Sequence, residues 1–441
     1  MAERISIPAK GIPRDELLSK MVSLGGNDAN WRDGRTWSLV YFAGEEHTAF
    51  LKKARNLFFA ENGLSPLAFP SLKTFENGVI AMTAGMLGGD EKTSGTMTTG
   101  GTESILMAMK AYRQWARVNR PSVKEPEILL PVTAHPAFEK AAHYFDLKAV
   151  HSPVENDFKA SVNATRELIS DNTIVMVGSA PAYPHGAIDP IPELAAIAEE
   201  NKIGFHVDSC LGGFMLPWLK KLGHPVTPFD FSVPGVTSIS ADIHKYGYAA
   251  KGASVVLYRS KELRRHQFFV YSNWPGGIYA SPSMTGTRAG GSIAAAWAAL
   301  NSIGEEGYMR LAESAMKSAK VIMEGIAGIK GLYVLGKPDM SVFAFASDTL
   351  DIFALGDAME RRGWHLDRQQ FPSSLHMMVT AAHEKVAEPF ISDLRESVQE
   401  VIANPKASSE GTAAMYGMAA SLPDRKAVDG FVLDFMDDIF K

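Results

Sequence analysis

The stretch VTSISADIHKYGYAAKGASVVLYRS, residues 236–260, holds two apolar segments with a polar loop between them. Residues 236–240 and 253–260 have the composition of buried β-strands. The loop that joins them carries Lys245 and Lys251. A preference of lysine for solvent does not explain well why Lys245 lies at the end of a buried strand. Because burial readily shifts the pKa of a lysine, a lysine in this place is a candidate for covalent chemistry with a carbonyl group.

Similar apolar runs precede this stretch, and helical patterns lie between several of them. The runs are EILLPVTA (127–134), TIVMVGSA (173–180) and IGFHVDSC (203–210). A helical pattern, IPELAAIAEENK (191–202), separates the last two. Strands that are apolar on both faces and alternate with helices indicate a mostly parallel sheet that helices cover on both sides. We therefore expect an α/β fold for the large domain.

The sequence after this region has a different organisation. A Gly- and Pro-rich stretch over 273–291 ends the large domain, and a long helical segment over 291–326 follows. The short strand and helix patterns beyond it predict a smaller α+β domain. The expected division is an N-terminal extension (1–60), a large α/β domain (61–300) and a C-terminal small domain (301–441).

The composition is that of an ordinary globular protein, since 46% of the 441 residues are hydrophobic and 21% are charged. The formal net charge of −5 gives no basis for binding nucleic acid or an anionic membrane surface. The single cysteine, Cys210, rules out an internal disulfide framework and fits a reducing compartment. No apolar run reaches the roughly 18 residues of a membrane-spanning helix, so we expect a cytoplasmic protein without a membrane anchor.

A pair of glycines precedes a predicted helix at 101–120. Gly100 and Gly101 leave the N–H groups of Thr102 and Glu103 open at the start of this helix. Such an N-terminus binds phosphate through free N–H donors and the helix dipole. Ordinary helix capping explains the same pattern, and both interpretations stay open for this motif by itself.

Two further polar residues follow apolar runs. Asp208 comes at the end of the run 203–210, where open α/β sheets bind their ligands. A buried carboxylate needs a partner, such as a protonated ring nitrogen, although Asp208 could instead cap the next turn. His135 follows the run 127–134 and could stack on a flat cofactor ring or be an ordinary core histidine.

Taken together, these motifs provide each contact that pyridoxal phosphate requires. The glycine turn would bind the phosphate, His135 would cover the ring, and Asp208 would pair with the ring nitrogen. Lys245, which follows Ser240 and His244 in the pattern Ser-x-x-x-His-Lys, would bind the aldehyde carbon. The combination therefore favours a pyridoxal-phosphate enzyme, and no metal site is expected.

The residues also resemble one family. Segments similar to the sphingosine-1-phosphate lyases, a family of fold-type I pyridoxal-phosphate enzymes within the decarboxylase group, run from about Tyr41 to about Arg425. They include GGTESILMAMKAYR, PHGAIDPIPELA, HVDSCLGGF, GVTSISADIHKYGYAAKGAS and GGIYASPSMTGTRAGG. Many of these segments lie outside the expected cofactor contacts. The resemblance implies a large domain with a mostly parallel sheet, a smaller C-terminal domain and a homodimer with shared active sites.

The resemblance also implies roles for individual residues. Lys245 would bind the cofactor covalently, Asp208 would pair with its ring nitrogen and His135 would stack on its ring. The residues expected around the cofactor phosphate are Gly101, Thr102, Ser240 and His244, with Thr287 from the partner subunit. The expected contacts to substrate are Tyr41, which enters the neighbouring site, Tyr183, Lys251 on the substrate phosphate, and Ser65 and Arg288.

The implied reaction is a retro-aldol cleavage of a small, anionic amine, with Tyr41, Tyr183 and Lys245 as acid–base candidates. One position departs from the family. Ser65 in LSPLAFPSL stands where the family has a histidine that helps to bind the substrate phosphate, and Leu67 stands for an aspartate. Losing a charge-assisted hydrogen bond of this kind costs on the order of 1.5–3 kcal/mol. Drift in a tolerant pocket and a changed substrate both explain the departure.

Four functions therefore remain open from the sequence. The first is cleavage of a phosphorylated sphingoid base to a long-chain aldehyde and phosphoethanolamine, and the second is the same chemistry on a different β-hydroxy amine or amino acid. The third is an amino-acid decarboxylase, for which Arg288 is the candidate carboxylate ligand. The fourth, a cofactor-binding interaction protein, is disfavoured because Lys245 and Asp208 are both retained.

Overall fold

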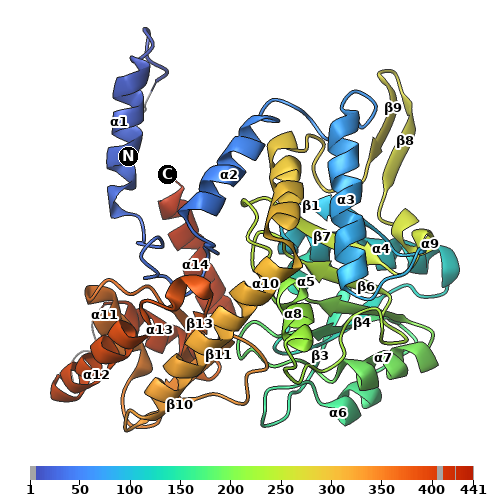
Figure 1. The fold of residues 1–441 in the computed structure, drawn as a ribbon. Coiled ribbons are helices and arrows are strands. Elements are labelled where there is room, and N and C mark those ends of the chain that lie inside the picture. Colours follow the sequence, from blue (N-terminus) through green and yellow to red (C-terminus); the bar gives the residue numbers. More distant parts are fainter. Residues whose placement is uncertain (1–5, 405–410, 423, 441) are drawn as a thin grey trace.

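The computed structural model describes residues 6–404, 411–422 and 424–440. A seven-stranded sheet forms the centre of the larger part of the molecule (Figure 1). Its strands lie in the order β1-β7-β6-β5-β4-β2-β3, and β7 runs antiparallel to both neighbours while the other pairs are parallel. The strands are β1 (Ser94–Thr98), β2 (Glu127–Pro131), β3 (Lys148–Ser152), β4 (Thr173–Ser179), β5 (Gly204–Asp208), β6 (Ser238–Ala241) and β7 (Ser254–Tyr258). The expectation of a mostly parallel sheet is confirmed.

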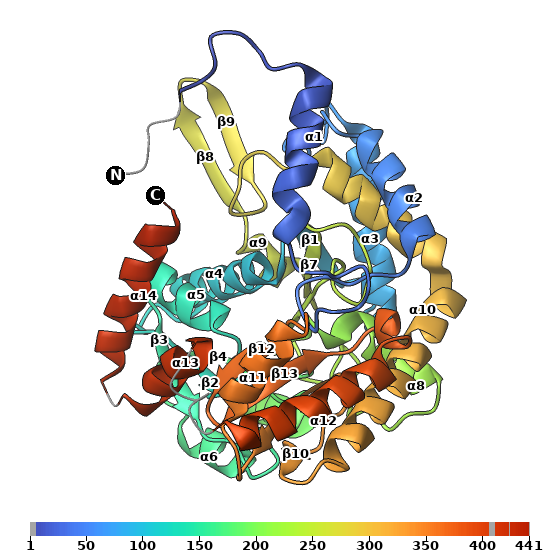
Figure 2. The same cartoon turned by 90° about the vertical axis from the view of Figure 1, so that its left-hand side faces the viewer.

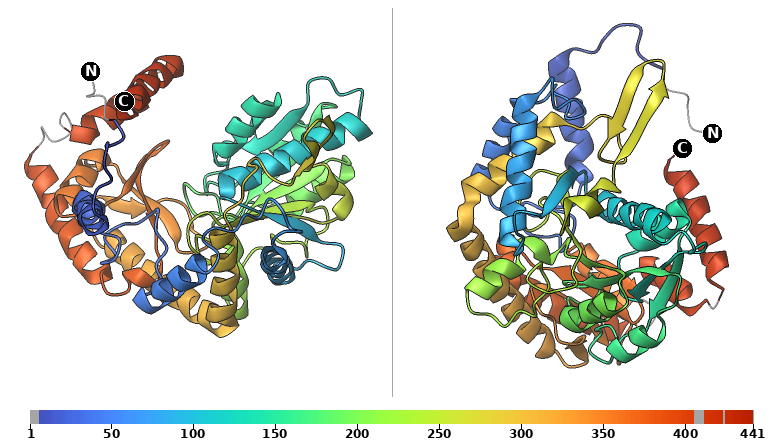
Figure 3. Two further views of the ribbon diagram at one scale, coloured as in Figure 1. Left: turned by 90° about the horizontal axis from the view of Figure 1, so that it is seen from above. Right: turned by 90° about the vertical axis from the view of Figure 1, so that its right-hand side faces the viewer.

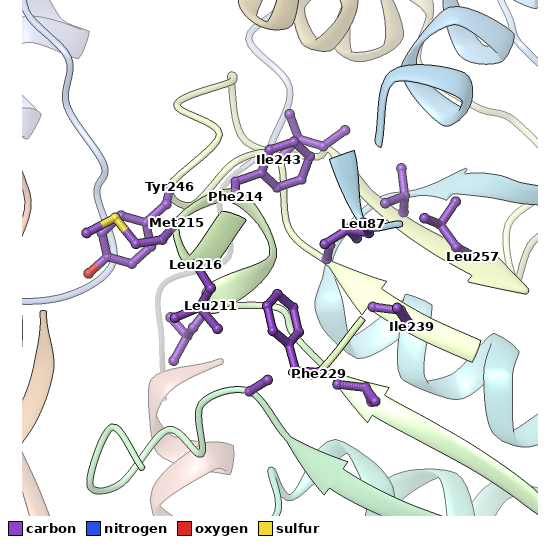
Figure 4. Close-up of a cluster of buried hydrophobic side chains, with 14 of the residues drawn as sticks. Leu87, Leu211, Phe214, Met215, Leu216, Phe229, Ile239, Ile243, Tyr246 and Leu257 are labelled. Carbon is purple, nitrogen blue, oxygen red and sulfur yellow. The ribbon is translucent and has the colours of Figure 1, made fainter. Parts of the chain in front are cut away.

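Helices cover both faces of this sheet. Along β7, Val255 and Leu257 belong to one hydrophobic cluster, whereas Val256 and Tyr258 belong to the cluster on the opposite face. Figure 4 shows part of the first cluster, where Leu257 lies beside Leu87 and Ile239. The covering helices are α3 (Pro70–Met86), α4 (Gly101–Asn119), α5 (Ala137–Phe145), α6 (Val162–Glu167), α7 (Ile191–Glu200), α8 (Leu216–Lys221) and α9 (Lys261–Arg265). Burial on both faces explains why these strands appear in the sequence as continuous apolar runs.

A second, antiparallel sheet lies in the C-terminal part, in the order β10-β11-β13-β12. Helix α10 (Gly290–Ala327) connects the two parts and has a break in its helical geometry at Gly304 (Figures 1 and 2). The remaining elements of this part are β10 (Leu332–Val334), β11 (Val342–Ser347), α11 (Ile352–Arg361), β12 (Asp367–Gln370), β13 (Ser373–Met378), α12 (Ala387–Ala403), α13 (Gly411–Ser421) and α14 (Arg425–Ile439). The domain boundaries at residues 60 and 300 stay a prediction.

Several elements expose apolar side chains. Helices α1 (Arg14–Leu24) and α2 (Glu45–Asn56) lie at the N-terminal end, and α1 has no buried residue. The hairpin of β8 (Phe269–Trp274) and β9 (Gly277–Ser281) projects from the large part (Figure 3).

The 3-10 turns are η1 (Gly25–Asn27), η2 (Gly212–Phe214) and η3 (Ala381–His383). Among the described residues, no helix combines the length and apolar character needed to cross a bilayer.

A close backbone contact joins the two parts of the molecule at Gly186. Its φ is +67°, and a Cβ at this position would lie 1.7 Å from the carbonyl oxygen of Val342 in β11. Its own carbonyl accepts a hydrogen bond of 2.9 Å from the N–H of Asp339, and the Asp339 carboxylate accepts one of 2.7 Å from the N–H of Ile188. Only glycine fits this junction.

We expect Gly186→Ala to destabilise the protein through this contact. The matched control is Gly223→Ala, because Gly223 also has a positive φ, +87°, but a Cβ there would meet no atom within 4 Å. The control should lose about 1 kcal/mol from left-handed strain, and Gly186→Ala roughly 1–3 kcal/mol more from overpacking. Denaturant unfolding measures both, and equal losses in the two variants would contradict the steric account.

Candidate active site

A cavity of about 370 Å³ lies at the carboxyl ends of the central strands. The segments that follow β1, β2, β4, β5 and β6 all contribute to its walls, as expected where parallel strands end at one edge of a sheet. Seven of the predicted site residues lie together in it. They are Gly101, Thr102, His135, Tyr183, Asp208, His244 and Lys245.

Lys245 forms an ion pair with a buried carboxylate. Its Nζ lies 3.0 Å from Oδ2 of Asp242, whose side chain is 1% exposed, and Nε2 of His244 lies 3.8 Å from the same oxygen. Burial by itself lowers the pKa of Lys245, but the charge of Asp242 and of the other acidic groups nearby outweighs it and raises the pKa. Without a ligand, the ammonium form is therefore stabilised.

The start of α4 faces the cavity with two glycines, Gly100 and Gly101, which have no side chains. A Cβ on Gly101 would lie 2.8 Å from both Oδ2 of Asp242 and Sγ of Cys210, and a Cβ on Gly100 would lie 3.3 Å from the His244 ring. Glu103 fixes the turn, since its carboxylate accepts hydrogen bonds from the N–H of Thr99 (2.6 Å) and of Met284 (2.9 Å). The free N–H groups of this turn can therefore bind an anion.

Asp208 also lines the cavity and is held there as a hydrogen-bond acceptor. Its Oδ1 accepts from the N–H of Cys210 (3.1 Å) and from the hydroxyl of Ser240 (3.2 Å). Ser240 is fully buried and also lies 3.3 Å from Nε2 of His206. Ser240 thus bonds Asp208 and is not among the residues that line the cavity, and its predicted contact with the cofactor phosphate stays a prediction.

His135 and Tyr183 form the remaining walls. Nδ1 of His135 accepts a hydrogen bond of 3.1 Å from the N–H of Ala137, and burial lowers the pKa of the ring despite the charge of Asp208. The imidazole is thus neutral and flat. Tyr183 donates its hydroxyl proton to Oδ2 of Asp367 over 2.9 Å, and its ring centre lies 6.5 Å from that of His135.

Tyr41 and Lys251 line a neighbouring cavity of about 380 Å³, with His244 in the wall of both. Nζ of Lys251 lies 5.2 Å from the centre of the Tyr41 ring. Burial, and then the charge of Lys245, lower the pKa of Lys251 to about 8. Burial also raises the pKa of Tyr41, with the charge of Asp242 as the next cause. A phenol and a cation therefore lie next to the Lys245 cavity within one chain.

The other predicted residues lie elsewhere in the chain. Ser65 and Arg288 line a third cavity of about 700 Å³, and Thr287 is exposed beside it. The guanidinium of Arg288 is bound by Glu76 at 2.5 Å and by the carbonyl of Met97 at 3.1 Å. One chain by itself does not bring these residues to Lys245.

Three charged or titratable residues of this region were not predicted from the sequence. Asp242 stands between Ser240 and His244, and its place in that motif was the available signal. Asp367 and His376 come from β12 and β13, about 180 residues after Tyr183, and no local pattern in the sequence connects them to it.

The residues fit pyridoxal phosphate. The glycine turn at the start of α4 offers N–H donors for the phosphate, the Asp208 carboxylate suits a protonated ring nitrogen, and the neutral His135 ring suits stacking. Lys245 supplies the amine that binds the aldehyde. These contacts surround a single cavity large enough for one small ligand.

The chain is similar to known proteins over most of its length. The pyridoxal-dependent decarboxylase conserved domain matches residues 36–347. A sphingosine-1-phosphate lyase of Oryza sativa subsp. japonica is 47% identical over 98% of this chain and 81% of its own length. The solved sphingosine-1-phosphate lyase of Burkholderia pseudomallei K96243 has a TM-score of 0.87 at 42% identity, covering 92% of this chain and 95% of its own. A Lactobacillus brevis glutamate decarboxylase, at TM-score 0.79 and 20% identity, shows the fold alone, and this fold is the expected fold type I.

We expect Asp242→Asn to shift the pH dependence of cofactor uptake. Only the neutral amine attacks an aldehyde, and removing the Asp242 charge lowers the pKa of Lys245. Covalent uptake of pyridoxal phosphate, followed by its visible absorption, should therefore reach its half-maximal rate at lower pH than in the wild type.

The first control is Asp230→Asn, which should behave as the wild type because Asp230 bonds Ser232 outside the cavity. The second control is Lys245→Ala, which should bind no pyridoxal phosphate covalently. A rate profile that stays unchanged in Asp242→Asn would contradict this account of the ion pair.

Proposed function

The chain belongs to the sphingosine-1-phosphate lyase family of pyridoxal-dependent decarboxylase-like proteins, and on that basis we propose that it is a carbon–carbon lyase. The proposed reaction is a pyridoxal-phosphate-dependent retro-aldol cleavage of a phosphorylated sphingoid base. Its products are a long-chain aldehyde and phosphoethanolamine. The single observation that supports it best is the cavity that combines Lys245, Asp208 and the open turn of α4.

Some residues of the cavity would bind the cofactor, and another would transfer a proton. When bound, pyridoxal phosphate supplies an electron sink for the pair released as the carbon–carbon bond breaks. Lys245 would bind the aldehyde carbon, Asp208 would keep the ring nitrogen protonated, and the first turn of α4 would bind the phosphate. Tyr183 lies in the wall and can exchange a proton with the substrate hydroxyl.

The neighbouring cavity suits the anionic end of the substrate. With a pKa of about 8, Lys251 is mostly charged at neutral pH and can pair with a phosphate. His244 forms part of both cavities, so an amine at Lys245 and an anion at Lys251 could belong to one molecule. The assignment of Tyr41 and Lys251 to the substrate stays a proposal.

The other functions have less support. Arg288, the candidate carboxylate ligand of a decarboxylase, is bound by Glu76 and lines a different cavity from Lys245. Cleavage of a different β-hydroxy amine remains the second candidate, because Ser65 and Leu67 replace the residues that the family resemblance implies.

We also propose that the enzyme is a homodimer with shared active sites. Ser65 and Thr287 lie away from Lys245 within one chain, which is consistent with their serving the site of a partner. The hairpin beside Ser65 exposes apolar side chains, with Val270 63% and Ile278 78% exposed. A cytoplasmic location stays part of the proposal.

The function is tested by offering sphingosine 1-phosphate to the cofactor-loaded protein and measuring aldehyde and phosphoethanolamine. Lys251→Met should raise KM for this substrate about tenfold or more, because a charge-assisted contact of about 1.5–3 kcal/mol is lost. In the wild type, KM should also rise as the pH rises through about 8, since Lys251 then loses its charge.

Lys330→Met is the control, because Lys330 is exposed and outside both cavities. Release of carbon dioxide from amino acids without aldehyde from the phosphorylated amine would favour the decarboxylase instead. Cleavage of another β-hydroxy amine, with no turnover of the phosphorylated base, would support the second candidate.

We expect the double variant Val270→Glu, Ile278→Glu to weaken the dimer and to lower activity in parallel, because it places charges on the exposed hairpin. Sedimentation at several protein concentrations measures the association. Val118→Glu is the control, since Val118 is 60% exposed at the far end of α4. A wild type that is monomeric and fully active would contradict the shared-site proposal.

A further inference from the structure

Tyr183 is fixed by the C-terminal part of the molecule. It follows β4 in the large part, but its hydroxyl donates to Oδ2 of Asp367 in β12 over 2.9 Å. In the strand register, Asp367 lies directly opposite His376 of β13, so both side chains project from the same face of the second sheet. These two residues therefore reach Tyr183 together.

His376 supports the same tyrosine in two ways. Its ring stacks on the Tyr183 ring, with centres 4.1 Å apart and planes 22° apart. Its Nε2 lies 2.8 Å from the carbonyl oxygen of Tyr183, and burial lowers the pKa of the imidazole to about 4, so the ring is neutral and donates through Nε2. A neighbouring side chain, Gln369, donates to the carbonyl of Pro184 over 3.0 Å. The position of the phenol is thus set by β12 and β13.

The direction of the Tyr183 hydroxyl has a chemical consequence. Burial, and then the charge of Asp367, raise the pKa of Tyr183, so the phenol is neutral near pH 7. Its one proton points at Asp367, so the lone pairs of its oxygen are left for other partners. In this arrangement the tyrosine accepts a proton from a group in the cavity only as it passes its own proton to Asp367.

Asp367 in turn lies next to a residue that contacts solvent. Its Oδ1 is 3.9 Å from Nε2 of His365, whose side chain is 41% exposed, and His365 lies 3.9 Å from Glu360 on its other nitrogen. Charged and titratable groups therefore continue from Tyr183 to the surface. Asp367 itself is 28% exposed.

We propose that Asp367 is a positioning residue that makes Tyr183 the proton acceptor of the cleavage step. As the substrate hydroxyl becomes the aldehyde carbonyl, its O–H bond breaks and a new O–H bond forms on Tyr183. The original Tyr183 proton moves to Oδ2 of Asp367. The carbon that loses the aldehyde takes up one proton from water, and Asp367 then releases one proton to water on the side of His365, so the carboxylate is restored and no net proton is gained or lost. The inference rests on the proposed lyase function and assigns it a proton path.

The test compares Asp367→Asn with the wild type. The asparagine oxygen can still accept the Tyr183 hydrogen bond, but the amide cannot take the proton. We expect kcat to fall roughly 10²-fold, with KM and the cofactor absorption unchanged, and Asp367→Glu to recover part of the loss. Asp348→Asn is the matched control, because Asp348 accepts a similar bond of 2.8 Å from the Tyr333 hydroxyl at an exposed place in the same part of the molecule.

A double-mutant cycle separates this role from a structural one. If Asp367 acts through Tyr183, the double variant Tyr183→Phe, Asp367→Asn should be no slower than Tyr183→Phe. Losses that multiply in the double variant, or an Asp367→Asn enzyme with full kcat, would overturn the proposal.

A second readout does not depend on turnover. The wild-type protein should show a downfield hydroxyl proton resonance that disappears in Tyr183→Phe and moves upfield in Asp367→Asn, because the hydrogen bond to a carboxylate is the stronger one. Absence of any resonance that responds to both variants counts against the hydrogen bond itself. A wild type that shows the resonance but cleaves no phosphorylated amine contradicts the proposed function and, with it, the proton path, while the hydrogen bond stands.

Discussion

The buried carboxylate of Asp242 is the charge around which the cavity is arranged. An ionised group that is 1% exposed needs a counter-charge, and Lys245 supplies it at 3.0 Å. The same carboxylate leaves no space for a side chain on Gly101, which brings the open turn of α4 against the lysine. Two segments that are distant in sequence, residues 242–245 and the start of α4, therefore meet at a single oxygen atom, and the phosphate end and the reactive end of the cavity are held together.

The sequence was most informative where burial governs local composition. Strands such as β4 and β5 are covered on both faces, so their apolar runs, and the end of β5 at Asp208, could be predicted from the sequence. The hairpin of β8 and β9 was not predicted from the sequence. Its exposed strands have no pattern of alternating residues that faces a core.

Side-chain direction was harder to predict than position in the chain. Ser240 belongs to the motif that carries Lys245, and its hydroxyl lies between Nε2 of His206 and Oδ1 of Asp208. The sequence motif did not indicate that this hydroxyl donates to Asp208. Asp367 could not be found from local sequence at all, because strand pairing in the second sheet brings it to Tyr183. Contacts of this kind depend on the tertiary fold and leave no periodic signal.

Glu103 has a consequence for how the molecule responds to ligands. Its two oxygens bind the turn at Thr99, which lines the cavity, and the N–H of Met284, in the segment that leads from the hairpin to Thr287. In the proposed dimer, a cofactor would order the turn at Thr99 and a partner subunit would order the segment at Met284. The same Glu103 carboxylate is bonded to both. Cofactor occupancy and association of the proposed dimer would then be linked equilibria, in which each changes the affinity of the other by the same factor.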